Sequence, residues 1–314
     1  MQEPAAVWSL RFALFAAALV VVALLLHRMG HLETPAFVNT VGLAFLIAAL
    51  AVAVGFYAGG SIWIRGRTGA WQVFLGVAGG LLVWSWPLAV LPRYVSLPTI
   101  ADVSTDTTAT APAFVKLAPQ RKYRGNGPVY PGAAFARRQE AAYPDIRSFV
   151  VDRSVDDVHD IILDMIAGRR GFGWRIAADQ PPSLRPLRPG LIEATERSMI
   201  IGFLDDIVIR IEGSEKQAKV DVRSASRFGR HDFGTNAARI RRLLRELTAR
   251  LESTALSGTV PRRPQFRDDG TRVPDKSVKR PIERIREKAE ARRAQESAPK
   301  DARRAPAQKA PRQE

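Results

Sequence analysis

The sequence predicts an integral membrane protein of the α+β class, with three N-terminal transmembrane helices followed by a small antiparallel-sheet domain whose two helices pack on one face. The first observation is that the opening 92 residues are nearly devoid of charge and contain three long apolar stretches. The second is a set of short alternating runs and two runs of helical periodicity between residues 143 and 255. The third is a C-terminal segment of Pro, Arg, Lys and Ala that is too polar to bury a core.

These shifts in composition divide the 314 residues into four segments. A transmembrane anchor covers 1–92, an extended linker covers 93–142, the α+β domain covers 143–255, and a disordered basic tail covers 256–314. Cysteine is absent, which excludes disulfides, zinc–thiolate sites, iron–sulfur ligation and a cysteine nucleophile. We expect the chain to hold no cofactor and no metal ion.

The three apolar stretches are Val7–Leu26, Phe37–Ala58 and Ala70–Leu91. Each has about 20 residues, enough for a helix to cross ~30 Å of hydrocarbon at 1.5 Å per residue. The only charge within them is Arg11, near an end, so we expect an anchor rather than an ion path or a proton relay. Three buried helices of a soluble protein are the alternative, but soluble core helices seldom run this long without a polar face.

Two pairs of glycines in these stretches have the spacing that lets membrane helices approach closely. The pairs are Gly55 with Gly59 and Gly76 with Gly80. They favour either a compact three-helix bundle within one chain or oligomerisation through the transmembrane helices.

The charges of the short loops predict the orientation in the membrane. Arg65 and Arg67 lie in the second loop without an acidic residue, whereas Arg28 in the first loop is balanced by Glu33. Positive residues favour the cytoplasmic side. We therefore expect a multi-pass protein of the bacterial inner membrane with a periplasmic C-terminal domain.

The positive charge of the chain is concentrated at its C-terminus. The net charge of the chain is +16. Residues 256–314 contain 17 Lys and Arg against 9 Asp and Glu, so this segment carries a net charge of +8, half of the surplus. Because this half lies in a low-complexity tail, the pI of 10.9 does not lead us to expect nucleic-acid binding. The tail is either a solvated disordered segment or an electrostatic arm for anionic lipid or polymer.

The α+β domain is predicted from its periodicity. A helix begins after Ser154, with apolar residues at helical spacing up to Ile166, and Gly168 ends it. A second helix covers Thr235–Leu251 and has an apolar stripe. His159, which is surrounded by acidic residues in the first helix, is expected to be exposed. Strands are expected over Arg147–Asp152, Gly173–Ala177, Leu191–Thr195, Asp206–Glu212 and Ala218–Ser226.

Two runs carry a resemblance to a known family. They are IEATERSMIIGFLDDIVIRIEG, from Ile192, and VDVRSASRFGRHDFGTNAARI, from Val220. Together with DVSTDTTATAPAF, from Asp102, they resemble the bacterial and plastid domain-of-unknown-function family 1499, in its longer, membrane-anchored version. Short members often carry an Asn-Cys motif before the domain, which this chain lacks. The resemblance covers about 102–251 and implies a fold and a membrane setting, but no established activity.

The densest cluster of polar residues lies between Arg223 and Arg239. One interpretation is structural: Asp232 or Thr235 caps the last helix, while Arg223 and Arg227 pair with acidic residues across the sheet. The other is an anion site, because a helix N-terminus flanked by Arg and Ser side chains can hold a phosphate or carboxylate. The candidate ligand-binding residues are Arg223, Ser226, Arg227, Asp232, Asn236, Asp205 and Asp206.

An enzyme is the alternative to a binding module. A membrane-tethered hydrolase would use Asp205, Asp232 or His231, but Asp205 and Asp206 are adjacent on a strand, so their side chains point to opposite faces. No P-loop, nucleophile elbow or dinucleotide fingerprint occurs in the sequence. We therefore expect no catalytic residues, and a domain that binds or scaffolds an envelope component such as lipid or an anionic polymer.

Overall fold

The computed structural model describes residues 1–121, 126–167, 172–184 and 187–257. The tail expected from residue 256 therefore lies almost entirely outside the described residues. Within them, three N-terminal helices are long and apolar enough to cross a membrane, as predicted. They are α1 (Pro4–Met29), α2 (Thr34–Arg65) and α3 (Ala70–Ser96).

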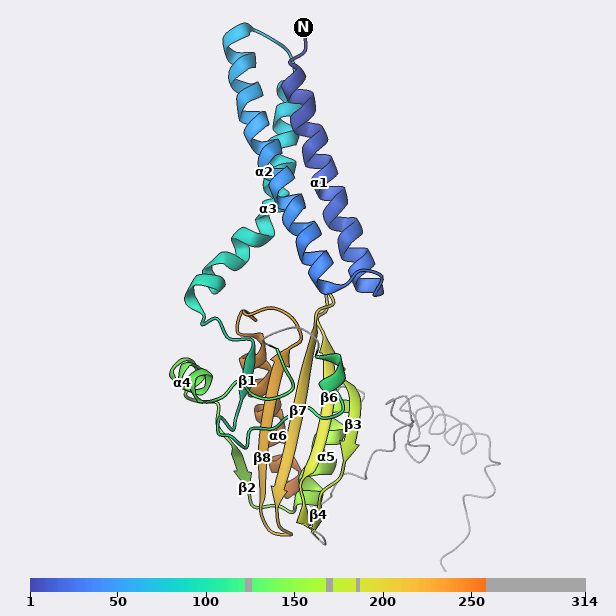
Figure 1. Cartoon of the computed structure of the whole chain (residues 1–314), viewed down its shortest axis with the longest axis vertical. Coiled ribbons are helices and arrows are strands. Elements are labelled where there is room, and N and C mark those ends of the chain that lie inside the picture. The colour runs from blue at the N-terminus through green and yellow to red at the C-terminus, as the bar shows by residue number, and fades with distance from the viewer. Residues whose placement is uncertain (122–125, 168–171, 185–186, 258–314) are drawn as a thin grey trace, which may run out of the picture. The chain divides into compact units, whose positions relative to one another are not determined.

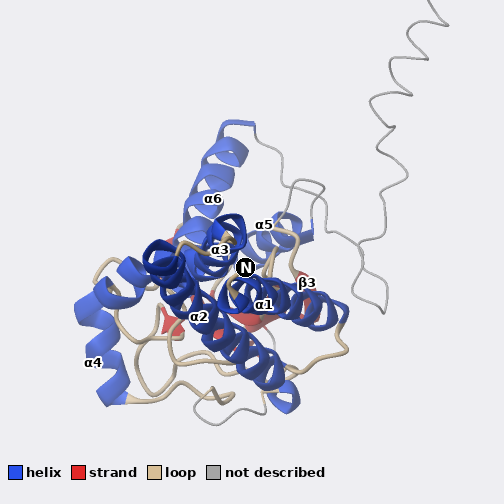
Figure 2. Cartoon of the chain, turned by 90° about the horizontal axis from the view of Figure 1, so that it is seen from above, coloured by secondary structure: helices blue, strands red, loops and turns tan. Residues whose placement is uncertain are grey.

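The membrane helices are separated by short turns. Gly30 and Gly66 follow the last residues of α1 and α2 with φ angles of 82° and 63°, a left-handed conformation that ends a helix and favours glycine. Figure 2 views the three helices from their ends, where they lie next to one another. The lower part of α3 bends away in Figure 1. Pro87 and Pro92 lie in that part, and each removes a helical hydrogen bond.

Small residues hold the bundle together around Ser9. Its hydroxyl donates to the carbonyl of Ala51 over 2.8 Å. A Cβ atom on Gly76 would lie 2.2 Å from Ser9 Oγ, and one on Gly55 would lie 2.8 Å from it. One on Gly80 would lie 2.9 Å from the Ala48 carbonyl oxygen. These glycines therefore serve close packing within one chain.

The C-terminal domain is built on a twisted antiparallel sheet. Among the described residues it has six strands, in the order β1-β8-β7-β6-β3, with β2 also paired to β8. Two further strands, β4 and β5, form a separate ribbon. The bounds are β1 (Asp102–Ser104), β2 (Phe149–Val151), β3 (Arg175–Gln180), β4 (Ser183–Leu184), β5 (Leu187–Arg188), β6 (Gly190–Arg197), β7 (Leu204–Gly213) and β8 (Ala218–Ser226).

Two helices cover one face of this sheet, as the sequence predicted. They are α5 (Val155–Ala167) and α6 (Thr235–Ser257), and both lie behind the sheet in Figure 1. Ile207, Ile209 and Ile211 alternate along β7 and join both helices in one buried cluster. The antiparallel α+β fold is therefore confirmed.

The opposite face of the sheet is covered by irregular chain. Phe114 and Leu117 bury Val208 of β7 and Ala225 of β8. Residues 118–120 form a short 3-10 helix, and α4 (Ala133–Ala142) follows. The segment expected as an extended linker thus contributes a strand, a helix and a second buried cluster to the domain. Strand β1 and the Phe114–Leu117 cluster are too short to show a period, and their partners lie on β7 and β8, far away in sequence.

His159 is buried and not exposed as expected, with a relative exposure of 1%. Val155, His159 and Ile162 belong to the stripe of α5 that faces the core, so helical spacing overrides the acidic neighbours. The Nε2 atom of His159 lies 2.8 Å from a carboxylate oxygen of Asp179 on β3.

Candidate functional site

The turn between β8 and α6 brings the predicted polar residues to the start of α6. Phe233 and Gly234 have φ angles of 54° and 78°, and the second of these favours glycine. Asp232 accepts hydrogen bonds from the backbone N–H groups of Gly234 (2.8 Å) and Asn236 (2.7 Å). Asp232 is therefore the cap of α6. Burial raises its pKa above the usual range, against these two hydrogen bonds.

Arg223 of β8 is fully buried and pairs with Asp102 of β1. Its Nε and Nη2 atoms donate to the two carboxylate oxygens over 2.9 and 2.7 Å. Its Nη1 atom donates to the carbonyls of Pro112 and Pro128, and the guanidinium lies over the ring of Phe114. This bidentate geometry ties β1, the first strand of the domain, to its neighbour β8.

Arg227 pairs with Asp206, one of the partners expected from the sequence. Its Nε and Nη2 atoms lie within 3.0 Å of the carboxylate. A second guanidinium, that of Arg121, donates to the same carboxylate over 2.7 Å, and both side chains of this second pair are fully buried. Burial lowers the pKa of Arg121, while the charge of Asp206 opposes that change. One buried carboxylate on β7 thus holds both an irregular segment and the residue that follows β8.

Asp205 lies on the other face and pairs with Arg239 of α6 over 2.6 Å. Arg239 also contacts Glu196. Burial opposes its charge, but these two carboxylates raise its pKa above the usual value. The Oδ1 atom of Asn236 accepts from Ser224 and Arg239, and its Nδ2 donates to Ser226 Oγ over 3.1 Å.

The turn also contacts the end of α3. The Nε2 atom of His231 lies 3.2 Å from the carbonyl oxygen of Leu97, and its Nδ1 accepts the N–H of Phe233 over 2.9 Å. The ring stacks on Tyr94 at 5.0 Å between centroids. Both ring nitrogens of His231 are therefore in contact with backbone groups.

A second feature, the hairpin between β6 and β7, lies at the ends of α1 and α2. We call residues 198–203 the hairpin tip. Met199 and Ile200 in it are 87% and 64% exposed. The ring of His27 donates to the carbonyl of Ile201 over 2.9 Å, and Arg28 donates to the carbonyl of Ser198 over 3.1 Å.

Aromatic stacking reinforces this junction. The ring of His27 stacks on Phe37 of α2 at 4.5 Å, and Phe203 of the hairpin tip approaches both rings edge-on. The guanidinium of Arg197 donates to the carbonyls of His27 and Arg28. The hairpin is thus joined to two membrane helices by side chains from both.

A comparison with family models matched part of the chain. Residues 105–247 match a family described as a protein of unknown function, DUF1499. These residues form a DUF1499 domain. The match includes the irregular segment with Arg121, the strands from β2 to β8 and the first half of α6, and it begins just after β1. Comparisons with curated proteins and with solved structures gave no match.

The seven candidate residues of the DUF1499 domain fall into separate groups. One group surrounds the start of α6, where contacts link Asp205, Ser226, Asp232 and Asn236 directly or through Arg239. Asp206 and Arg227 meet on the opposite face of the sheet. Arg223 lies on this opposite face too, where it pairs with Asp102 and its guanidinium covers the ring of Phe114. The alternation that separates Asp205 from Asp206 is confirmed.

Two residues of this polar network, Arg121 and Asp102, were not anticipated as part of it, and both lie in the segment expected as a linker. Glu193 was expected from the sequence as a possible partner of Arg223 or Arg227. Its carboxylate instead accepts three backbone N–H groups of residues 115–117, each at 2.9 Å. Asp102 could have been identified from the sequence, because it begins the run DVSTDT that resembles the family. Arg121 had no such signal, because its partner is 85 residues away.

Proposed function

We propose that the DUF1499 domain is a binding or scaffold module on the periplasmic surface of the bacterial inner membrane, where it engages phospholipid. The observation that carries the proposal is the exposed apolar hairpin tip beside the ends of α1 and α2. Met199 and Ile200 face outward, while the backbone next to them is bonded to His27 and Arg28.

Energetics favour a bilayer around this tip. Moving a side chain the size of Met or Ile out of water is worth about 1.5–3 kcal/mol. His27 lies in the last turn of α1 and Phe37 in the first turns of α2, so the tip adjoins the level at which two membrane helices end. Exposed apolar side chains at that level can enter the bilayer interface.

Charge beside the tip favours phosphate. Arg28 and Arg197 are exposed there, and guanidinium groups bind phosphate oxygens with two parallel hydrogen bonds. An anionic envelope polymer offers a similar charge but no hydrocarbon for Met199 and Ile200. Phospholipid is therefore the ligand class that satisfies both parts of the surface.

The polar network supports this proposal as a frame. The carboxylate of Asp206 holds Arg121 and Arg227, and Asp102 holds Arg223. Internal pairs of this kind fix the sheet and its hairpin in position. In this proposal the seven candidate residues support the lipid-binding surface.

The absence of cysteine makes a direct test possible. A Met199→Cys variant of the full chain carries one thiol, which can bear a nitroxide spin label. A Leu187→Cys variant is the matched control, because Leu187 is 74% exposed on β5. Both are reconstituted into bilayers with and without phosphatidylglycerol, and the collision rates of each label with oxygen and with a water-soluble nickel complex are measured.

We expect the label at 199 to be rich in oxygen collisions and shielded from nickel, and the label at 187 to show the reverse. Phosphatidylglycerol should deepen the label at 199. Equal nickel accessibility at the two positions in both bilayers would reject the proposal.

A further inference from the structure

We infer that the C-terminal part of α3, residues 87–96, is an amphipathic helical segment that lies in the interface between lipid and water. Its apolar face contacts hydrocarbon, and Arg93 on the opposite face points to the phosphate groups. The segment begins at Pro87, where α3 bends away (Figure 1). It belongs to a different element from the hairpin tip, so it is a second contact with phospholipid and does not depend on the first.

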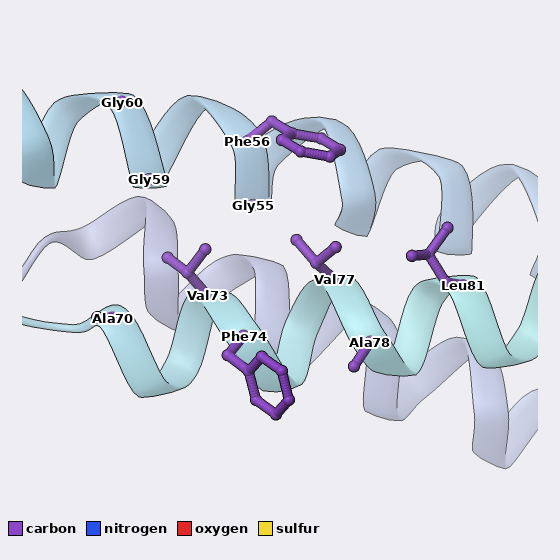
Figure 3. Close-up of a pocket in the computed structure, with 10 residues that line it drawn as sticks. All are labelled: Gly55, Phe56, Gly59, Gly60, Ala70, Val73, Phe74, Val77, Ala78 and Leu81. Carbon is purple, nitrogen blue, oxygen red and sulfur yellow. The ribbon is translucent and has the colours of Figure 1, made fainter.

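Before the bend, α3 packs against α2. Val73, Val77 and Leu81 point toward α2, whereas Phe74 points away from it (Figure 3). A Cβ atom on Gly55 of α2 would lie 2.4 Å from Val77, so the two helices are close there. The side chains in this half of α3 are therefore arranged by contact with a neighbouring helix.

After the bend, the apolar side chains of α3 are no longer covered by the bundle. Every residue from 91 to 96 is exposed. Leu88, Leu91 and Val95 are 54%, 49% and 76% exposed. Aliphatic side chains of this size favour an apolar environment over water. A partner other than the bundle therefore covers them.

Polar and apolar residues lie on opposite sides of this segment. At about 100° per residue, Leu88, Leu91 and Val95 lie within about 60° of one another around the helix axis. Arg93 lies about 160° from both Leu91 and Val95, and Ser96 lies about 60° from Arg93. Helices with one aliphatic face and one polar face are typical of the bilayer interface.

The boundary between hydrocarbon and water falls within this segment. Residues 70–86 form about 25 Å of helix, slightly less than the ~30 Å thickness of the hydrocarbon layer. At the other end of the segment, the carbonyl of Leu97 contacts His231 of the DUF1499 domain. A helix that crosses this boundary obliquely keeps its aliphatic face in lipid when its polar residues share the opposite face.

The apolar face fits a bilayer better than a helix from a second copy. Membrane helices that pair closely do so through small residues, and the small residue Ala89 lies about 40° from Arg93, on the polar side. A stable protein interface buries about 1,200–2,000 Å², which three aliphatic side chains on so short a segment do not supply. Arg93 can reach headgroup phosphate while its stem stays against the apolar region.

An aromatic cluster joins the segment to the DUF1499 domain. Tyr94 is 56% exposed, and its ring lies 5.0 Å from that of His231 and 6.3 Å from that of Phe233. Phe233 has a φ angle of 54°, which is rare for a bulky residue, and its side chain is 38% exposed. Tyrosine is enriched at the bilayer interface. The position of the segment in the bilayer therefore also fixes the turn that precedes α6.

Single-cysteine variants of the full chain test the inference, because the natural chain has no cysteine. Spin labels on Leu88→Cys, Leu91→Cys and Val95→Cys report the apolar face, and labels on Arg93→Cys and Ser96→Cys report the polar face. Each variant is reconstituted into bilayers of phosphatidylethanolamine and phosphatidylglycerol. The collision rates of each label with oxygen and with a water-soluble nickel complex are then measured.

We expect the ratio of oxygen to nickel collisions to be high at 88, 91 and 95 and low at 93 and 96, a period of about 3.6 residues. A ratio that changes steadily from 88 to 96 would overturn the inference, because an upright end of the span gives that result. Equal nickel accessibility at all five positions would overturn it too. So would spin–spin coupling between labels at 91 or 95, because a second copy would then cover the face.

A pair of lysine substitutions provides the matched control. Leu91→Lys places a charge on the apolar face, and Ala89→Lys places the same charge on the polar face, both at exposed positions. With the label on Val95→Cys, Leu91→Lys should raise nickel collisions toward the level at 93, and Ala89→Lys should leave them unchanged. Equal effects of the two substitutions would contradict the inference. The label at 199 reports the hairpin tip alone, so the two proposals fail independently.

Discussion

At the scale of single residues, the DUF1499 domain is organised by carboxylates that hold segments distant in sequence. Asp102 binds Arg223, Asp206 binds Arg121 and Arg227, and the pairs are largely or fully buried. A buried charge without its partner is costly, so each such pair specifies which segments meet even if its net contribution to stability is small. The family-like motif at Arg223–Arg227 thus positions chain segments.

Asp106 provides a prediction at this scale. It accepts hydrogen bonds from Thr108, Thr110 and Arg210. Burial alone would raise its pKa, but these bonds outweigh burial and lower the pKa from 3.8 to about 2. A depressed carboxyl pKa stabilises the fold above the unfolded-state value and loses that stabilisation as the pH falls.

We therefore expect Asp106→Asn to destabilise the protein by about 1–3 kcal/mol at pH 7. The difference from the natural chain should shrink between pH 4 and pH 2, where the natural carboxylate becomes protonated. Thermal unfolding of the detergent-solubilised chain, followed by circular dichroism across this range, measures it. Glu215→Gln, at an exposed position, is the control and should follow the natural chain at every pH. A difference for Asp106→Asn that is constant down to pH 2 would contradict the expectation.

At the scale of elements, length and periodicity were enough to predict most of the structure. The three apolar stretches, the stripes of α5 and α6 and the alternation of β7 each repeat over several turns or strand residues, so the pattern is local. Strand β1 has three residues and is defined by its pairing with β8, more than 100 positions away. Such an element cannot be read from its own sequence.

The same distinction applies to the candidate site. Asp206 lies on β7 and Arg227 directly follows β8, and the alternation of these neighbouring strands could be predicted, so their pairing could be anticipated. Arg121 reaches Asp206 from irregular chain, where side-chain direction follows no period. The hairpin tip was not predicted as a functional surface, because the sequence does not show that its apolar residues lie beside the last turn of α1 and the first turns of α2.

The helix packing supplies the prediction at this scale. Gly76→Ala should destabilise the bundle by about 1–3 kcal/mol, the usual cost of overpacking, because the new Cβ would lie 2.2 Å from Ser9 Oγ and 2.8 Å from the backbone nitrogen of Leu10. Gly42→Ala, which meets no neighbour, is the matched control. Unfolding in mixed micelles with increasing sodium dodecyl sulfate measures both. Equal transition midpoints would show that the α1–α3 contact tolerates a larger side chain.

At the scale of the whole molecule, an odd number of spans determines which ends of the helices share a side. The turn at Thr68 is bonded to Met1 and Glu3 at the start of α1, whereas the DUF1499 domain contacts His27 and Leu97 at the ends of α1 and α3. With Arg65 and Arg67 in the turn, positive-inside counting favours a cytoplasmic turn and a periplasmic domain.

Reporter fusions test this orientation. An alkaline phosphatase fused after residue 255 should be active, because that enzyme works only outside the cytoplasm, and a green fluorescent protein at the same point should be dark when exported through the general secretory route. The same reporters inserted at Thr68 should give the opposite result. A fluorescent fusion after residue 255 would reverse the proposed orientation.

The ion pair between Asp102 and Arg223 also determines at which residue a soluble fragment of the domain can begin. A fragment that begins at residue 143, where periodicity first becomes regular, would keep a fully enclosed guanidinium but discard the carboxylate that neutralises it. Such a fragment should misfold or aggregate, even though it retains strands β2 to β8. A soluble version of this domain has to start upstream of β1, within a few residues of the membrane.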